Sequence, residues 1–344
     1  MLKAGVVGFG VMGKTHCKCY HSFPGVQVVA ICEIGDIKKL GTSQAAANLG
    51  KLDTAMDIEN VRLYSDFDKM LQEEKLDLVS ITLPTYMHAD YTVKALEAGL
   101  HVLCEKPMAL DLEQCQLMID AAKRSGKVLQ IGHCIRFWPE YVKARHIIES
   151  GEYGKVRAAT FQRLSAPPTW SWNNWQRAGS KNGGGAMMDL HIHDVDIILH
   201  WFGLPESVYT SAAQGPTGCY DHILTQYAYP DDKVVTAEAS WLMAPGFGFR
   251  MSFNIALEKA TITFDSTSDP SLKIHTFDNK TYTPAPENKD GYWFEIEYFI
   301  KTILGEKLPR IITPQQSYDA VRIALAEKIS ADEHLKVELS EVKC

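Results

Sequence analysis

A glycine-rich segment near the start of the chain has the spacing of a phosphate-binding loop. Residues 8–13 have the pattern G-x-G-x-x-G, between an apolar run, Lys3–Val7, and a helix-like stretch, Gly13–Ser22. In such a loop the first glycine permits a tight turn, the second lets backbone N–H groups approach a pyrophosphate, and the third lets helix and strand pack closely. The N–H groups of the helix start then attract the anion. The residues predicted to bind a dinucleotide here are Gly8, Phe9, Gly10, Val11, Met12 and Gly13.

An acidic residue follows at the distance that a dinucleotide site requires. Glu33 lies 20 residues past Gly13 and ends a second apolar run, Val26–Cys32. A carboxylate there accepts hydrogen bonds from ribose hydroxyls and repels a 2′-phosphate, which favours NAD over NADP. Lys38 and Lys39 lie nearby and weaken this preference. The predicted cofactor is NAD, with NADP as the alternative, and an ordinary glycine-rich turn beside a solvated Glu33 is the structural alternative.

A lysine and an acid–histidine pair have the types and places needed for proton transfer. Glu105-Lys106-Pro107 follows a predicted strand, His101–Cys104, at the sheet edge where ligands of open α/β sheets bind. Asp189 and His193 are four residues apart in a helical pattern, so a carboxylate could orient an imidazole suited to act as a base near pH 7. The structural alternatives are a surface lysine and a helix-surface ion pair.

Three segments together resemble the Gfo/Idh/MocA family, the glucose–fructose oxidoreductase and inositol dehydrogenase group. They are Thr82-Leu-Pro-Thr-Tyr-Met-His88, Ala98-Gly-Leu-His-Val-Leu-Cys-Glu-Lys-Pro107 and Gly183-Gly-Gly-Ala-Met-Met-Asp-Leu-His-Ile-His-Asp-Val-Asp196. The resemblance implies an oxidoreductase that transfers a hydride between nicotinamide and a secondary alcohol or ketone of a sugar, inositol or sugar derivative. It also implies catalytic roles for Lys106, Asp189 and His193. The further cofactor contacts that it implies are Thr82, Leu83, Pro84, His88 and Glu105.

The family also contains regulators that have lost catalysis, so a cofactor-binding sensor without turnover is the alternative function. The complete set of lysine, aspartate and histidine favours the enzyme. The chain departs from the family pattern at His191, a position that is often Gly. We interpret it as a hydrogen-bonded helix histidine, with a substrate or metal ligand as the alternative. No metal is predicted, because neither His191-x-His193 nor His16-Cys17-x-Cys19-x-His21 can converge on one ion within a helix.

Two arginines and a tryptophan-rich stretch are the candidates for substrate binding. Arg136 lies in the segment that leads out of the first domain, and a salt-bridged linker arginine is its alternative interpretation. Arg163 starts a stretch that contains Trp172 and Trp175, whose rings could stack on a sugar or form the loop's own core. The predicted substrate is a small sugar or polyol, and the sequence does not specify which one or which hydroxyl reacts.

The order of the elements predicts two domains. Residues 1–134 alternate apolar strands with helical patterns, which predicts a doubly wound parallel sheet of the Rossmann type. Residues 135–344 contain consecutive strands followed by two late helices, Gly291–Leu304 and Pro314–Asp332, which predicts an α+β domain with a large, mostly antiparallel open sheet. Catalysis is expected between the halves. On the family resemblance, the second domain binds substrate and forms a homodimer or homotetramer through its sheet.

Composition excludes several classes of protein. The chain has 344 residues, which is long enough for two domains at about 150 residues each. Its 35 Lys and Arg against 42 Asp and Glu give a net charge of −7, which argues against nucleic-acid and anionic-membrane partners. No apolar run approaches the roughly 18 residues of a membrane span, and no cleavable leader is evident. Eight cysteines are too few for a disulfide scaffold, so a cytoplasmic protein with reduced thiols is expected.

Overall fold

The computed structural model describes residues 1–35, 45–47, 50–52, 60–168, 179 and 183–343. The described chain divides into two compact units. The first unit consists of Met1–His133 together with Tyr292–Tyr318, and the second consists of residues 134–291 and 319–344 as far as they are described. None of the described helices is long and apolar enough to cross a membrane.

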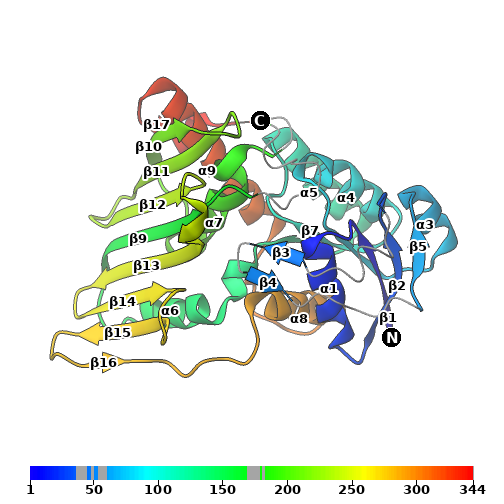
Figure 1. Ribbon diagram of the computed structural model, residues 1–344, viewed down its shortest axis with the longest axis horizontal. Coiled ribbons are helices and arrows are strands. Elements are labelled where there is room, and N and C mark those ends of the chain that lie inside the picture. Colours follow the sequence, from blue (N-terminus) through cyan, green and yellow to red (C-terminus); the bar gives the residue numbers. More distant parts are fainter. Residues whose placement is uncertain (36–44, 48–49, 53–59, 169–178, 180–182, 344) are drawn as a thin grey trace. The chain divides into compact units, whose positions relative to one another are not determined.

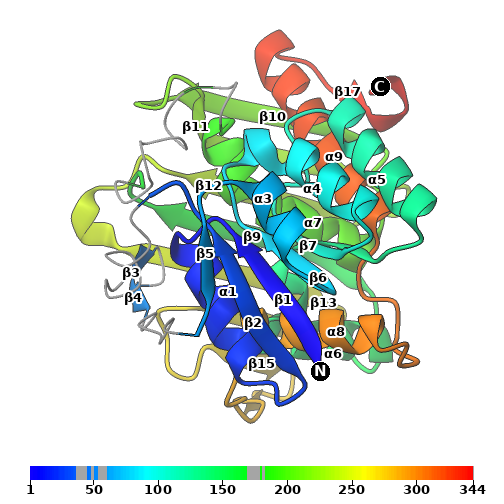
Figure 2. The same cartoon turned by 90° about the vertical axis from the view of Figure 1, so that its right-hand side faces the viewer.

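The first unit is built on a six-stranded parallel sheet (Figure 2). Its strands, in spatial order, are β5 (Arg62–Tyr64), β2 (Val26–Cys32), β1 (Leu2–Val7), β6 (Leu78–Ile81), β7 (His101–Glu105) and β8 (Leu129–Gly132). Taken in chain order this is the arrangement 3-2-1-4-5-6 of dinucleotide-binding domains. Strand β6 is buried along its whole length, as expected for a parallel sheet with helices on both faces.

Helices cover this sheet from two sides. The helices of the first unit are α1 (Val11–His21), α3 (Phe67–Glu73), α4 (His88–Glu97), α5 (Leu112–Ser125) and α8 (Gly291–Ile303), with a 3₁₀ turn at Thr85–Met87 and a short ribbon of β3 (Ala45–Ala47) and β4 (Gly50–Leu52). Asp111 is the N-cap of α5, since its side chain accepts a hydrogen bond from Gln114 N at 2.8 Å.

Helix α8 explains why the first unit is discontinuous in sequence. Its side chains Ile296 and Phe299 are fully buried in one apolar cluster with Tyr20 of α1 and Val6 of β1. The sequence-based division assigns all of residues 135–344 to the second domain, whereas residues 292–318 cluster with the first unit. A burial pattern alone cannot tell which of two cores an apolar helix joins.

The second unit is built on a nine-stranded open sheet (Figure 1). Its strands, in spatial order, are β16 (Thr281–Tyr282), β15 (Leu272–Thr276), β14 (Ala260–Asp265), β13 (Phe249–Leu257), β9 (Val156–Ser165), β12 (Val234–Ser240), β11 (Tyr220–Ala228), β10 (Ser207–Gln214) and β17 (Val337–Glu338). Strands β9 and β12 pair in parallel and the other neighbours pair antiparallel. Both parts of the predicted fold class are therefore confirmed.

One face of this sheet carries the helices of the second unit. They are α6 (Pro139–Ser150), α7 (Ile192–Phe202) and, from Asp319 onward, α9 (Pro314–Glu333), with 3₁₀ turns at Cys134–Phe137, Pro245–Phe247 and Leu339–Glu341. Helix α9 starts with a capping box, in which Gln316 N donates to Thr313 Oγ1 and Thr313 N donates to Gln316 Oε1, each at 3.2 Å. The sequence analysis missed α6 and the three-residue strand β5.

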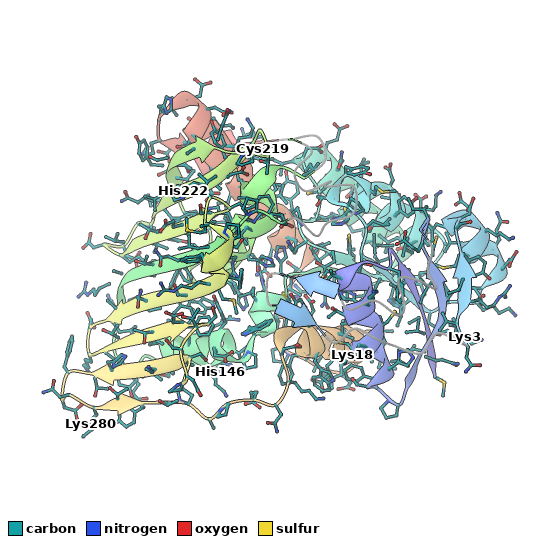
Figure 3. The ribbon with its side chains drawn as sticks, in the orientation of Figure 1. Lys3, Lys18, His146, Cys219, His222 and Lys280 are labelled. Carbon is teal, nitrogen blue, oxygen red and sulfur yellow. The ribbon has the colours of Figure 1, made fainter. Side chains whose placement is uncertain are left out.

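The other face of the sheet is not covered by helices in the described chain (Figure 1). Strand β11 alternates between buried and more exposed residues, which is the pattern of a strand with one face on the core. Figure 3 labels His222, which shares the outward face of β11 with Leu224. Three apolar side chains on this face are about half exposed: Tyr209 (48%), Leu224 (46%) and Val234 (52%).

Candidate active site

Each of the three glycines in the loop of the first unit has a different structural reason to be glycine. Gly8 has φ +89°, and a Cβ on it would lie 2.6 Å from Thr82 O. A Cβ on Gly13 would lie 2.0 Å from Gly8 O, so only glycine lets α1 pack this closely on the loop. By contrast, a Cβ on Gly10 would meet no described protein atom within 4 Å. The loop is therefore tight inside and open at Gly10, where a phosphate would approach the start of α1.

Glu33 lies beside this loop at the end of β2. One carboxylate oxygen accepts the N–H of Phe9 at 2.7 Å, and the other accepts the N–H of Gly35 at 3.0 Å. Each oxygen keeps a second lone pair. The carboxylate is thus fixed against the glycine loop and able to accept hydrogen bonds from ribose hydroxyls.

The segment after β6 braces the same loop. Thr82 Oγ1 lies 2.7 Å from Gly8 O and 3.0 Å from Val7 O, so its hydroxyl donates to the loop backbone. His88 is only 1% exposed, and burial lowers the pKa of its ring. Its Nδ1 lies 2.8 Å from Pro107 O and its Nε2 lies 2.9 Å from Leu83 O. A neutral ring carries one N–H, so His88 donates to Pro107 O in one tautomer and to Leu83 O in the other. The ring thus lies between the loops after β6 and β7, whereas the sequence analysis expects it to contact the cofactor.

Lys106 follows the last residue of β7 and is half-buried. Glu105, which precedes it, lies in the core, with Oε1 3.1 Å from His16 Nε2 and Oε2 accepting the N–H of Lys106 at 3.2 Å. Burial alone would raise the pKa of the Glu105 carboxyl, but the hydrogen bond and charge of His16 and the charge of Lys106 hold it below its usual range. The carboxylate of Glu105 is ionised and engaged inside the unit.

In the second unit, Asp189 and His193 flank a change of helix type. Met187–His191 forms a π-helical turn that continues into α7, where the sequence predicts a single α-helix over 187–202. Both side chains are half-buried. π-helical turns are frequent at functional sites because they shift side chains out of the 3.6-residue register. Asp189 lies in the π-helical turn and His193 in the α-helix that follows it, so their relative direction differs from that of two residues four apart in a regular α-helix.

The glycines before this turn serve close packing. Gly184 and Gly185 have φ +70° and +68°, a region that favours glycine. A Cβ on Gly185 would lie 2.5 Å from Cys219 Cβ and 3.1 Å from Tyr220 O. The absence of a side chain at Gly185 therefore lets the backbone pack closely against Cys219 and Tyr220 at the start of β11.

The two arginines expected to bind substrate are buried in ion pairs that hold α7. Arg163 of β9 makes two hydrogen bonds to Asp194, at 2.8 and 3.0 Å, and their side chains are 2% and 0% exposed. Arg136 makes two hydrogen bonds to Asp196, at 2.7 and 2.8 Å, and is equally buried. This is the salt-bridged alternative for Arg136. Because neither guanidinium is exposed, both fix the helix that carries His193.

His191 is fully buried against α9 and β11. Its Nε2 lies 3.2 Å from the carboxylate of Glu327, and Tyr227 donates its hydroxyl to the same carboxylate at 2.6 Å. Burial lowers the pKa of His191, but the adjacent Glu327 charge outweighs burial, so the pKa is raised. The interpretation as a hydrogen-bonded helix histidine matches this geometry.

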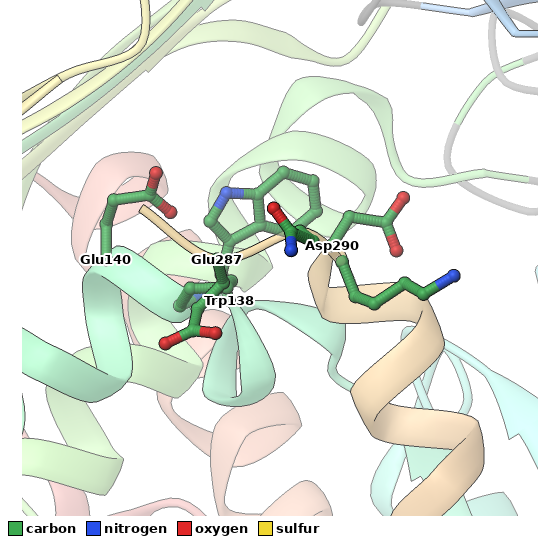
Figure 4. A pocket seen from close by; sticks show the side chains of 7 residues that line it. Trp138, Glu140, Glu287 and Asp290 are labelled. Atoms are coloured by element: carbon green, nitrogen blue, oxygen red, sulfur yellow. The ribbon is translucent and has the colours of Figure 1, made fainter. Parts of the chain in front are cut away.

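The predicted tryptophans and the hollow in the second unit remain to be placed relative to the predicted site residues. Trp172 and Trp175 lie outside the described residues. A hollow of about 340 Å³ in the second unit is lined by none of the predicted site residues; it is lined by Trp138, Pro139, Glu140, Glu287, Asn288, Lys289 and Asp290 (Figure 4). Among the described residues, no group of three or more His, Cys, Asp or Glu side chains is placed to hold a metal ion.

The sequence analysis missed the partners of these residues. Ser80 accompanies His16, and Asp194, Asp196 and Glu327 accompany Arg163, Arg136 and His191. The available signal was the pair of acidic residues at 194 and 196, next to the apolar run Ile197–Leu199 of the same helical pattern. That signal does not say which distant arginine neutralises which acid.

Comparison with known proteins places both units in one family. Residues 2–133 match the model of the oxidoreductase family with an NAD-binding Rossmann fold, and residues 141–263 match the GFO/IDH/MocA C-terminal domain. The uncharacterized oxidoreductase ORF334 of Rhizobium meliloti is 30% identical over 327 residues, which are 88% of this chain and 91% of that protein.

Two named dehydrogenases are also similar to this chain. Inositol 2-dehydrogenase of Salmonella typhimurium is 33% identical over 202 residues, so the match spans 58% of this chain and about half, 54%, of that relative. A solved structure of levoglucosan dehydrogenase with NADH and levoglucosan shares the fold at a TM-score of 0.82 and 22% identity, covering 99% of this chain and 100% of that one. The chain therefore belongs to the Gfo/Idh/MocA family of oxidoreductases, with an NAD-binding Rossmann domain over residues 2–133.

Proposed function

We propose that this protein is an NAD-dependent dehydrogenase or reductase that interconverts a secondary alcohol and a ketone on a sugar, an inositol or a related polyol. The observation that carries the proposal is the presence, in one chain, of a nucleotide cradle opened by Gly10 and of the proton-transfer groups Lys106, Asp189 and His193. The names of the similar proteins, which act on inositol and levoglucosan, support the substrate class.

The first unit has the groups that a dinucleotide needs. Gly10 leaves space at the start of α1, whose N–H groups would hold the pyrophosphate. The Glu33 carboxylate, held by two backbone N–H groups, would accept the ribose hydroxyls and disfavour a 2′-phosphate. When bound, the nicotinamide ring supplies the hydride chemistry. NAD is therefore the proposed cofactor in preference to NADP.

The proton chemistry is assigned to three side chains. His193 takes the hydroxyl proton during oxidation and returns it during reduction, and Asp189 orients His193 and binds a substrate hydroxyl. The Lys106 ammonium polarises the same substrate oxygen and stabilises the negative charge that develops on it. Asp194 and Asp196, neutralised by buried arginines, keep the helix that carries His193 in one place.

The same proposal assigns residues 1–134 to cofactor binding and residues 135–344 to substrate binding and assembly, apart from residues 292–318, which cluster with the first unit. The half-exposed Tyr209, Leu224 and Val234 on the uncovered face of the nine-stranded sheet support a homodimer or homotetramer formed through that face. The seven cysteines of the described residues carry thiols and form no disulfide bonds, which supports the cytoplasm as the place of action.

The test is a panel of inositols, sugars and sugar derivatives with NAD or NADP, followed by the absorbance of reduced nicotinamide. We expect turnover with NAD by the wild type, and a loss of about 10²–10⁴-fold in kcat for Lys106→Met and for His193→Ala. Lys94→Met, which changes an exposed lysine paired with Asp68, is the matched control and should leave turnover unchanged. Tight NAD binding with no turnover on the whole panel would favour a sensor and overturn the proposal.

A further inference from the structure

A line of buried hydrogen bonds runs from helix α1 to the loop that carries Lys106. Tyr20 OH lies 2.8 Å from Ser80 Oγ, which lies 2.9 Å from His16 Nδ1. His16 Nε2 lies 3.1 Å from Glu105 Oε1, and Glu105 Oε2 accepts the Lys106 N–H at 3.2 Å. Tyr20, Ser80 and His16 are fully buried. The contacts lie within the first unit and end at the backbone of Lys106.

The directions of these bonds are set by the carboxylate. An ionised Glu105 can only accept, so His16 Nε2 and Lys106 N are its donors whether or not the ring is protonated. Ser80 is a hydroxyl and can donate to Nδ1 or accept from it, and Tyr20 supplies the complementary bond to Ser80. Every polar group in the line thus has a partner in both states of His16.

The opposite side of the same loop is held by a second histidine. His88 Nδ1 contacts the carbonyl oxygen of Pro107 at 2.8 Å. Lys106 therefore lies between Glu105, which contacts His16, and Pro107, whose carbonyl accepts from His88 in the tautomer that is protonated at Nδ1. The Glu105 side of the Lys106 backbone is held by His16, and the Lys106 side chain is half-buried.

Burying this line of polar side chains does not make the first unit more stable than apolar packing would, so its role is to orient a group. Tyr20 lies in the apolar cluster of α1, β1, β6 and α8, where well-packed hydrophobic residues would stabilise the fold as well as a histidine–carboxylate contact does. Hydrogen bonds in such surroundings are directional and strengthen one another, so they specify one position for the groups they end on. The group at the end of this line is the lysine assigned to catalysis.

We propose that His16 is a positioning residue for the reaction, which acts through Glu105 to set where Lys106 presents its ammonium group. The inference rests on the proposed function, because it takes Lys106 as catalytic. Displacement of a catalytic group by about 1 Å can cost on the order of 10²-fold in rate. Loss of the His16–Glu105 contact should therefore lower kcat, with KM for the polyol little changed.

Two variants of similar polarity separate this role from a general loss of packing. The amide nitrogen of Asn falls near Nδ1 of a histidine, and that of Gln falls near Nε2. His16→Asn keeps the bond to Ser80 and loses the bond to Glu105, whereas His16→Gln keeps a donor for Glu105. Tyr64→Phe removes a buried hydroxyl bonded to Glu74 at the far edge of the sheet and serves as the control.

The first measurement is amide hydrogen exchange of the peptide that contains Lys106, which needs no substrate. We expect exchange to rise by about tenfold or more in His16→Asn, because the Glu105 acceptor becomes free to move, and to stay near the wild-type rate in His16→Gln and Tyr64→Phe. Unchanged exchange in His16→Asn would overturn the inference.

The second measurement is kcat in a double-variant cycle. We expect His16→Asn to lower kcat by about 10–100-fold in the wild-type background and to add no further loss in the Lys106→Met background. Additive losses would show that His16 does not act through Lys106. Turnover by the wild type tests the proposed function separately. If the wild type turns over no polyol, the proposed function and the positioning role of His16 are both wrong.

Discussion

Removal of the Arg163 guanidinium should strongly destabilise the second unit. Arg163→Met keeps the length and apolar character of the side chain but leaves the Asp194 carboxylate buried, 0% exposed, without its cation. Removal of one partner of a buried ion pair typically costs about 3–5 kcal/mol. For a unit of this size that corresponds to a fall of roughly 10 °C in the melting temperature.

The assay is urea unfolding of the wild type, of the single variants Arg163→Met and Asp194→Leu, and of the double variant Arg163→Met/Asp194→Leu. We expect the double variant to be more stable than Arg163→Met, because it buries no unpaired charge. Arg124→Met breaks an ion pair to Glu97 whose side chains are 61% and 58% exposed, and should cost less than about 1 kcal/mol. A cost for Arg163→Met as small as that of Arg124→Met would refute the reasoning.

Three further predictions concern the nucleotide loop and His191. Gly10→Ala should leave the melting temperature unchanged, because its Cβ meets no described protein atom within 4 Å, but it should weaken NAD binding, because the Cβ occupies the space where the phosphate would approach. Gly13→Ala should lower the melting temperature, because its Cβ would lie 2.0 Å from Gly8 O. Thermal melts and NAD titration of both variants distinguish the two effects. Glu33→Ala should raise the Kd for NAD by about 10–100-fold and narrow the preference over NADP, as measured by titration with both dinucleotides. His191→Gln should cost most stability below about pH 6.5 and progressively less as the pH rises through the raised pKa of His191, as measured by urea unfolding over a pH series; a cost independent of pH would contradict the ion pair with Glu327.

The nucleotide loop could be predicted from the sequence because its physics is local. One stretch contains the strand, the three glycines and the start of the helix, and Glu33 follows at a fixed distance. The space for Gly13 and the position of Glu33 depend on neighbours within one βαβ unit. Local consistency of this kind is what a single sequence reports best.

The partners of the buried charges could not be predicted in this way. Arg163 and Asp194 are 31 residues apart, Arg136 and Asp196 are 60 apart, and His191 and Glu327 are 136 apart. An arginine has the same sequence signature whether it binds substrate or neutralises a buried acid. The packing of β9 and of the Cys134–Phe137 turn against α7 decides between the two for Arg163 and Arg136.

The register of the helix that carries Asp189 and His193 could not be predicted from the sequence either. The spacing of Asp189 and His193 predicts an α-helical pair, but the π-helical turn at Met187–His191 changes the rotation per residue between them. For His16, the helical spacing rules out a metal ion shared with Cys17 and Cys19, but it does not show that the contacts of His16 are Ser80 and Glu105.

The most direct test of the central proposal follows the hydrogen itself. The wild-type protein is incubated with NAD and an active polyol deuterated at its carbinol carbons, and the reduced nicotinamide is examined by mass spectrometry. The proposed reaction places one deuterium on the reduced ring, since the hydride comes from the carbon that bears the hydroxyl. Reduced nicotinamide without deuterium, or none formed with any polyol although NAD binds, would contradict the proposed reaction.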